Sequence, residues 1–323
     1  MITKFDTSRL RIFPIAERNH GLDLTNILPI QYKTCKYERI KTIAKKIITA
    51  KHLNASIIFM MGAHVIRAGV QKYLIDLMKR GYVTCIAMNG AGVIHDYEFT
   101  HCGATTECVA KYIKEGKFGL WKETGGLNTI INTAYKENKD IGMGEAVGKA
   151  ISERSFTHKN ISLFAAGYTL QIPITVHVGI GYDIIHEHPN CSGEATGALS
   201  YNDFLKFVSV VNNLENGIIM NFGSAVTAPE VFLKALSMAR NVAHQKGNVI
   251  RHFTTLVCDL HDLPDDFSRE PSRENAAYFF RPWKTMLVRT VSDGGESYYV
   301  KGNHSETIPA LWSAINDYEN NYF

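Results

Sequence analysis

The sequence lacks the patterns that mark membrane, exported and disulfide-bonded proteins. No apolar run reaches the ~18–20 residues needed to cross a bilayer, because Gly62 and His64 interrupt the most apolar segment, Ile57–Ile66. The first residues lack the charged-then-apolar pattern of a secretory signal. The six cysteines form no Cys-x-x-Cys pair, which predicts reduced thiols rather than disulfides or a structural zinc site. We therefore expect a cytoplasmic protein without a membrane partner.

Charge of one sign is not concentrated anywhere in the chain. The 35 Lys and Arg residues stand against 31 Asp and Glu residues, a net charge of +4, and they form no dense basic block. A surface that binds nucleic acid gathers its basic residues on one face or along one helix. No nucleic-acid partner is therefore expected.

Two familiar phosphate-binding motifs are also missing. The segments Gly62–His64 and Gly90–Gly92 contain glycine but lack the G-x-G-x-x-G spacing, and the chain has no G-x-x-x-x-G-K-S/T loop. An ordinary dinucleotide-binding dehydrogenase or a P-loop enzyme would carry one of them. Neither class is expected.

Short, continuous apolar runs alternate with helical patterns along the chain. Continuous apolar runs are typical of parallel strands that are buried on both faces. The predicted strands are Ser56–Met61, Val83–Met88, Pro173–Val178, Gly217–Phe222, Thr254–Leu260 and Thr285–Arg289. The predicted helices are Tyr37–Ala50, Val65–Arg80, Tyr201–Leu214, Pro229–Ala243 and Thr307–Tyr318, with a largely helical region from Gly92 to Gly167. This alternation predicts an α/β fold with a parallel sheet and helices on both faces, Rossmann-like in type.

The same pattern predicts the domain organisation. Residues 1–50 are basic and moderately polar, and we interpret them as an N-terminal arm. Residues 51–323 then form a single nucleotide-binding α/β domain. The acidic, proline-bearing stretch 262–273 is expected to be a surface loop.

Four predicted strands end in small residues. A ligand approaches the backbone closely at the carboxyl edge of a parallel sheet only where side chains are minimal. A helix that starts after such a turn points free N–H groups at a phosphate. We therefore predict a pocket for NAD, with plain turns between strand and helix as the alternative. The predicted cofactor-binding residues are Gly62, Ala63, His64, Asn89, Gly90, Ala91, Gly92, Gly179, Gly181, Gly223, Ser224, Ala225 and Asp259.

Histidines and carboxylates gather at the same strand ends. Histidine transfers protons near neutral pH, and a neighbouring carboxylate orients it and raises its pKa. The candidate catalytic residues are His95, Asp96, Asp183 and His186. The predicted base is His95 or His186, and Asp96 is expected to raise the pKa of His95, so activity should rise with pH through a range near or above neutrality. The alternative is that His95 only caps the start of a helix.

His186 and His188 are also candidates for a metal site. Two histidines two residues apart bind zinc when a carboxylate joins them, and Asp183 lies nearby. No third ligand has a characteristic spacing, however, and Pro189 indicates a turn. We predict no metal.

Four segments at the predicted strand ends resemble the deoxyhypusine synthase family. Residues 62–70 (GAHVIRAGV) resemble the family's Thr-Ser-Asn-Leu-Ile-Ser-Ser-Gly-Val, and residues 90–96 (GAGVIHD) fall where it has Ala-Gly-Gly-Val-Glu-Glu-Asp. Residues 178–183 (VGIGYD) resemble its Asp-Gly-Ser-Leu-Gly-Asp, with Asp183 retained, and residues 222–226 (FGSAV) replace its triple-glycine turn. The match covers about residues 55 to 290. It implies an NAD-binding fold, a transferase of amines and a homotetramer with sites between subunits.

The sequence departs from that family at the catalytic lysine, which forms an imine with the transferred aminobutyl group. Residues 227–230 (TAPE) occupy the lysine's place, and the nearest lysine is Lys234. Ile94 and His95 replace two glutamates, and His177 or Val178 replaces an aspartate that faces the polyamine. Deoxyhypusine synthase activity itself is therefore not expected.

Three functions remain open. The first is an NAD-dependent enzyme that acts on a small polar substrate, such as an amine, without the lysine-imine step. The second is a non-catalytic protein that senses NAD or stabilises a partner, and the third is a metal-assisted hydrolase. A homotetramer is expected from the resemblance, with a hint from the apolar, aromatic region Phe118–Ile131.

Overall fold

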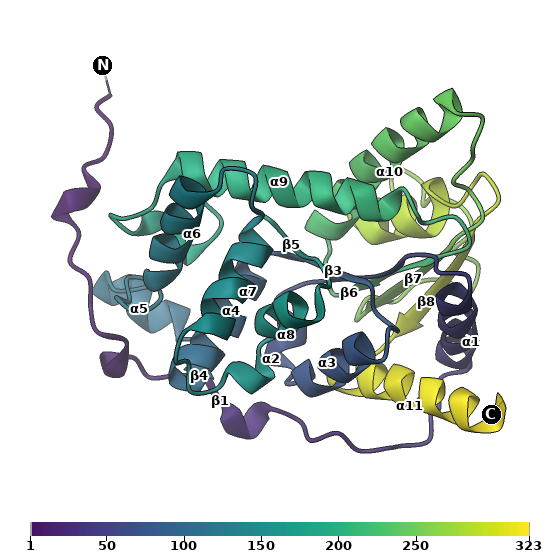
Figure 1. The fold of residues 1–323 in the computed structure, drawn as a ribbon, viewed down its shortest axis with the longest axis horizontal. Coiled ribbons are helices and arrows are strands. Elements are labelled where there is room, and N and C mark those ends of the chain that lie inside the picture. Colours follow the sequence, from purple (N-terminus) through teal and green to yellow (C-terminus); the bar gives the residue numbers. More distant parts are fainter. Residues whose placement is uncertain (1, 323) are drawn as a thin grey trace.

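A six-stranded, wholly parallel sheet forms the centre of the computed structural model, which describes residues 2–322. Its strand order is β5-β3-β2-β6-β7-β8. The chain therefore builds outward from β2 through β3 to β5, returns beside β2 as β6, and continues outward on the other side (Figure 1). The strands are β2 (Ile57–Met61), β3 (Cys85–Asn89), β5 (Ile174–His177), β6 (Ile218–Phe222), β7 (Thr254–Asp259) and β8 (Glu296–Lys301). The predicted parallel α/β fold is confirmed.

Helices cover both faces of the sheet, because alternate strand residues point to opposite sides. In β2, Phe59 packs into one apolar core and Met60 into the other. Helices α1 (Glu38–His52), α3 (Gln71–Lys79) and α11 (His304–Tyr322) contribute to the core around Phe59. Helices α9 (Gly193–Val211) and α10 (Thr227–Gln245) contribute to the core around Met60 and lie on the upper side in Figure 1.

The region between β3 and β5 is mainly helical, as predicted. It also contains a short strand, β4 (Ala104–Thr105), which pairs antiparallel with β1 (Leu22–Asp23) of the N-terminal segment. The helices are α4 (Gly90–Cys102), α5 (Val109–Glu115), α6 (Gly126–Glu137), α7 (Met143–Glu153) and α8 (Leu163–Leu170). The β1–β4 pair joins the N-terminal segment to the carboxyl end of α4.

The predicted helix Val65–Arg80 is in fact two helices, α2 (His64–Arg67) and α3. Gly69 lies between them with φ +75°, a left-handed conformation that favours glycine. Its carbonyl accepts a hydrogen bond from the amide of Leu28 at 2.8 Å, and a Cβ on Gly69 would lie 1.9 Å from the carbonyl oxygen of Asn26. The break therefore lets the N-terminal segment dock against the sheet domain.

The predicted strand Thr285–Arg289 is wrong. Residues Trp283–Arg289 form a π-helical segment, and the last strand is β8, which comes after it. Trp283, Met286 and Leu287 are all buried in one core, as the spacing of a helical face allows and that of a strand does not. The predicted loop 262–273 contains no helix or strand.

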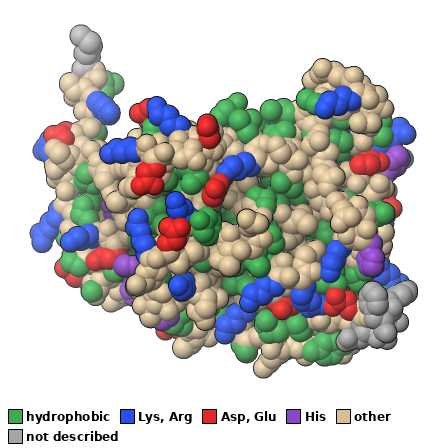
Figure 2. Space-filling view, viewed as in Figure 1, with side chains coloured by type: hydrophobic (Ala, Val, Ile, Leu, Met, Phe, Trp, Pro, Cys, Tyr) green, Lys and Arg blue, Asp and Glu red, His purple; other side chains and the backbone are tan. Residues whose placement is uncertain are grey.

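The division into an arm, residues 1–50, and a domain, residues 51–323, stays a prediction. Most of helix α1 lies within residues 1–50, yet its side chains Ile40, Ile43 and Ile47 are buried in the main core. Among residues 2–322 we find no helix whose length and hydropathy would let it span a bilayer. On the face drawn in Figure 2, basic and acidic side chains are interspersed.

Candidate functional site

A cavity of about 410 Å³ lies at the carboxyl ends of β2, β3 and β6. We call it the strand-edge cavity. Because β2 and β6 are neighbours from which the chain builds in opposite directions, it lies at the switch point of the sheet, where α/β folds bind their ligands. Its lining residues are Gly62, Ala63, His64, Arg67, Asn89, Ala91, His95, Gly223, Ser224, Ala225, Val226 and Thr227.

Two helices begin at this cavity. In α4, the side chain of Asn89 accepts a hydrogen bond from the amide of Gly92 at 3.2 Å, and Ala91 in the first turn lines the cavity. In α10, the hydroxyl of Ser224 accepts from the amide of Ala228 at 3.0 Å, and Thr227 lines the cavity. Helix N-termini attract anions. The exposed guanidinium of Arg67 adds a positive charge, and no carboxylate within residues 2–322 forms an ion pair with it.

The glycines at these strand ends allow the loops to pack against one another. A Cβ on Gly62 would lie 2.4 Å from the carbonyl oxygen of Gly223, and a Cβ on Gly90 would lie 2.0 Å from a carboxylate oxygen of Asp183. Gly223 has φ +64°. Side chains at these positions would therefore strain the fold itself, before any ligand is considered. The strand-end pattern marked the edge of the sheet where the strand-edge cavity lies. The requirement for glycine that the geometry shows is close packing of the loops.

A second cavity, of about 280 Å³, adjoins the first, and we call it the adjoining cavity. It shares Arg67, Ala91 and His95 with the strand-edge cavity. Its lining residues are Arg18, Arg67, Ala91, Ile94, His95, Glu98, Thr106, Glu107, Val109, Phe118, Tyr182, Asp183 and Ile184. The two cavities together offer one site with two compartments.

The adjoining cavity holds two carboxyl groups that form no ion pair within residues 2–322, those of Glu107 and Asp183. Burial raises the pKa of Asp183 to about 6. Burial also raises the pKa of Glu107, whose carboxylate accepts hydrogen bonds from the amide of Gly119 at 3.1 Å and the indole of Trp121 at 2.9 Å. A bound cation would relieve the cost of burying these charges. This compartment is therefore suited to a protonated amine.

His95 lies where the two cavities meet. Its Nδ1 is 2.8 Å from the hydroxyl oxygen of Thr105. Burial lowers the pKa of His95 to about 4; the charge of Glu98 raises it by less, and Arg67, His64 and Arg18 lower it further. The expectation that His95 has a raised pKa is wrong, because the effect of burial outweighs that of the carboxylate.

Asp96, the expected partner of His95, faces elsewhere. It is buried, and its carboxylate accepts hydrogen bonds from the hydroxyl of Ser162 at 2.5 Å and the amide of Leu163 at 2.8 Å. These are the contacts of a cap at the start of α8. Asp96 lines neither cavity.

Several other predicted residues also lie outside both cavities. His186 accepts hydrogen bonds at Nδ1 from the amides of Gly181 and Asp183, at 3.1 and 3.2 Å, and so holds a turn. His188 contacts the carbonyl oxygen of Gly119 at 2.8 Å. We find no cluster of metal-ligating side chains among the described residues. The predicted residues that line neither cavity are Gly90, Gly92, Asp96, Gly179, Gly181, His186 and Asp259.

Several residues of the site were missed from the sequence. Arg67 lies in residues 62–70, which resemble the deoxyhypusine synthase family, and its position after a predicted strand is a signal that could have identified it. Arg18 and Thr105 gave no signal, because both depend on the β1–β4 pair that brings distant segments together.

The neutral state of His95 can be tested directly. We expect its ring resonances to stay constant between about pH 8 and pH 5 in NMR titrations, because a histidine of ordinary pKa, about 6.5, would change there. Comparison with His95→Gln identifies the signals. A midpoint near 6.5 for His95 would contradict the expectation.

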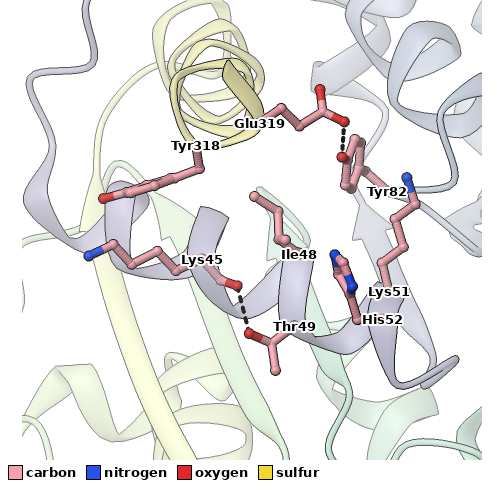
Figure 3. Close-up of a pocket in the computed structure, with 8 residues that line it drawn as sticks. All are labelled: Lys45, Ile48, Thr49, Lys51, His52, Tyr82, Tyr318 and Glu319. Atoms are coloured by element: carbon pink, nitrogen blue, oxygen red, sulfur yellow. Dashed lines mark hydrogen bonds between the residues drawn. The ribbon is translucent and has the colours of Figure 1, made fainter. Parts of the chain in front are cut away.

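A larger cavity, about 670 Å³, lies elsewhere, between α1 and α11 (Figure 3). His52 and Tyr82 line it and precede β2 and β3, so it lies toward the amino ends of the strands. The ammonium of Lys45 lies over the ring of Tyr318 at 4.9 Å. Glu319 hydrogen-bonds to Tyr82. Its lining is thus exposed lysines and side chains already paired with each other, which gives no reason to place chemistry there.

The comparisons with known proteins show the fold. No family model and no curated protein matches the chain. A conserved protein described as LOR/SDH from Methanococcus maripaludis S2 superposes with a TM-score of 0.51 at 15% identity, over 90% of this chain and 72% of that one. Unliganded AgrE gives a TM-score of 0.51 at 16% identity, over 88% of this chain. The match covers 34% of AgrE, so this chain spans about a third of its length. A protein described as a deoxyhypusine synthase from Entamoeba histolytica gives 0.37 at 11% identity, over 80% of this chain and 74% of that one. At that score, the resemblance to this family rests on the sequence segments quoted above.

Proposed function

We propose that this protein is an NAD-dependent enzyme of the deoxyhypusine synthase-like type that acts on a small polar substrate bearing an amine. The observation that carries the proposal is the position of the strand-edge cavity. It lies at the switch point of a parallel sheet, between the N-termini of α4 and α10 and beside the guanidinium of Arg67.

The residues around this cavity fit NAD. The first turns of α4 and α10 offer amide groups to a pyrophosphate, and Arg67 offers a positive charge. Ala91 leaves room where the two cavities meet. When bound, NAD supplies an acceptor for a hydride. The spacing of a standard fingerprint is absent, so these groups take the place of its glycines.

The adjoining cavity fits the amine. Asp183 and Glu107 provide negative charge for its ammonium form. His95 is neutral and lines both compartments, so it can accept a proton from the substrate nitrogen. Binding the amine beside the cofactor, and holding its proton on His95, are the steps that this chain's residues supply.

A first expected result concerns the covalent step. No lysine lines either cavity, and Lys234 is on α10, exposed and paired with Glu230. Borohydride reduction in the presence of NAD and spermidine should therefore trap no adduct. Mass spectrometry of the digested protein measures this. An adduct on Lys234 would refute the absence of the imine step.

A second expected result concerns cofactor binding. Ala91→Leu adds bulk at the wall shared by the two cavities, and should weaken NAD binding about tenfold or more, about 1.4 kcal/mol. Titration calorimetry measures the change. Ala198→Leu on α9, also half-buried but outside both cavities, is the matched control. Substitutions of Gly90 or Gly223 would not serve as a test, because they would strain the loops.

Two outcomes would change the proposal. An unaltered affinity in a folded Ala91→Leu protein would remove NAD from this cavity. Binding of NAD without turnover across a panel of amines and alcohols would favour the alternative, a non-catalytic sensor of NAD.

We also propose a homotetramer, from the family resemblance alone. The apolar segment Phe118–Ile131 gives no support for an interface between subunits, because Trp121, Leu127 and Ile131 are buried within this chain.

A further inference from the structure

A buried chain of hydrogen bonds ends at His95. It begins with Glu98, whose carboxylate accepts four hydrogen bonds. Arg18 donates two of them, at 2.8 Å each, Thr105 donates one at 2.6 Å and Thr124 one at 2.5 Å. All four residues are at most 4% exposed. Because Arg18 always carries its charge, Glu98 is ionised and can only accept.

This arrangement determines the role of Thr105. A threonine hydroxyl has one proton, and Thr105 donates it to Glu98. Its oxygen can therefore only accept from His95, whose Nδ1 is 2.8 Å away. His95 Nδ1 must then carry the ring proton, so Nε2 of the neutral imidazole is left without one.

We propose that Thr105, Glu98 and Arg18 are positioning residues that hold His95 as its Nδ1–H tautomer, so that bare Nε2 faces the ligand as a hydrogen-bond acceptor. His95 lines both cavities, and no residue in the described range 2–322 hydrogen-bonds to Nε2. The group bound against it must then offer an N–H or O–H, and a bare carbonyl or carboxylate is disfavoured. The inference rests on the proposed function only for the nature of the substrate.

The backbone explains why the chain of bonds is well defined. Glu98 follows His95 by three residues on α4, so the two side chains lie on the same side of the helix. Thr105 is on β4, where its partner is Leu22 of β1, and Arg18 lies four residues before Leu22. The N-terminal segment thus supplies Arg18, the cation that pairs with Glu98.

The test measures the tautomer of His95 by NMR, without cofactor or substrate. In neutral imidazole the protonated and bare nitrogens have well-separated ¹⁵N shifts, and His95→Gln identifies the signals. We expect bare Nε2 in the unmodified protein and in Thr105→Ser, which keeps the hydroxyl. Thr105→Val removes the acceptor, so a population with a protonated Nε2 should appear. A protonated Nε2 in the unmodified protein would overturn the inference, and so would an unchanged tautomer in folded Thr105→Val.

The unmodified protein gives a decisive result even if Thr105→Val does not fold. Once a substrate is known, Thr105→Val should lower kcat about 10-fold to 10⁴-fold, the larger figure being the effect of a wrong tautomer in serine protease triads. NAD affinity should stay unchanged, and Thr105→Ser should restore most of the rate. Failure to bind NAD would sink the proposed function and leave the tautomer result standing.

Discussion

Glu98→Gln is expected to lower the free energy of unfolding by about 3–5 kcal/mol, the usual effect of breaking a buried ion pair on one side. The guanidinium of Arg18 would stay buried without its counter-charge. The new amide would also present N–H groups to hydroxyls that now donate. Urea unfolding measures the change. Glu270→Gln is a matched control, because Glu270 and Arg289 form the same two-bond pair at the surface, where such pairs contribute about 0–1 kcal/mol.

The pH dependence of this effect has a definite sign. Burial alone would raise the pKa of Glu98, but hydrogen bonds and the charge of Arg18 bring it below its usual 4.5. A carboxyl group whose pKa is lowered by folding stabilises the fold above its unfolded pKa and loses this contribution as pH falls through its folded pKa. The difference between the unmodified protein and Glu98→Gln should therefore shrink only in acid, below about pH 4.5. Equal losses in Glu98→Gln and Glu270→Gln would contradict the buried-pair argument.

His95→Ala should lower turnover about 10²–10⁴-fold and leave NAD binding little changed, as expected for a residue that accepts a proton from the substrate. The imidazole lines both cavities, but in the proposed function the helix N-termini and Arg67 bind the phosphates of NAD. Steady-state rates and calorimetry measure the two quantities. His101→Ala, an exposed change on the same helix, should keep its turnover. Full turnover in His95→Ala would remove His95 from the chemistry.

The sheet could be predicted because its central strands are continuous runs of apolar residues, so their burial can be recognised from the sequence alone. All five residues of β2 are buried, so the run of apolar side chains needs no knowledge of neighbours. The edge strand β8 was missed because only Tyr299 and Val300 of its six residues are buried. The segment Trp283–Arg289 was misread because its apolar residues are equally compatible with a buried strand.

The site could be predicted only in part, for a related reason. The small residues at the strand ends indicated the edge of the sheet where the cavity lies, and they also indicated that His95 would lie there. The expectation that Asp96 is the partner of His95 was wrong, because adjacent residues on a helix point in different directions and Asp96 faces Ser162 and Leu163. Arg18 lies 80 residues from Glu98, and only the folded backbone joins them. Charge in the sequence shows that an ion pair is possible, but not where it forms.

The position of Arg18 also bears on the order of folding. Its pair with Glu98 closes a loop of 80 residues, whereas each strand of the sheet is followed by a nearby helix. Closing a long loop costs entropy before its contact forms, so the N-terminal segment should dock after β2, β3 and α4 have assembled. Until then Glu98 would lack its cation and His95 its fixed proton. A chain in which β2, β3 and α4 have assembled, but the N-terminal segment has not docked, would thus have an incomplete site.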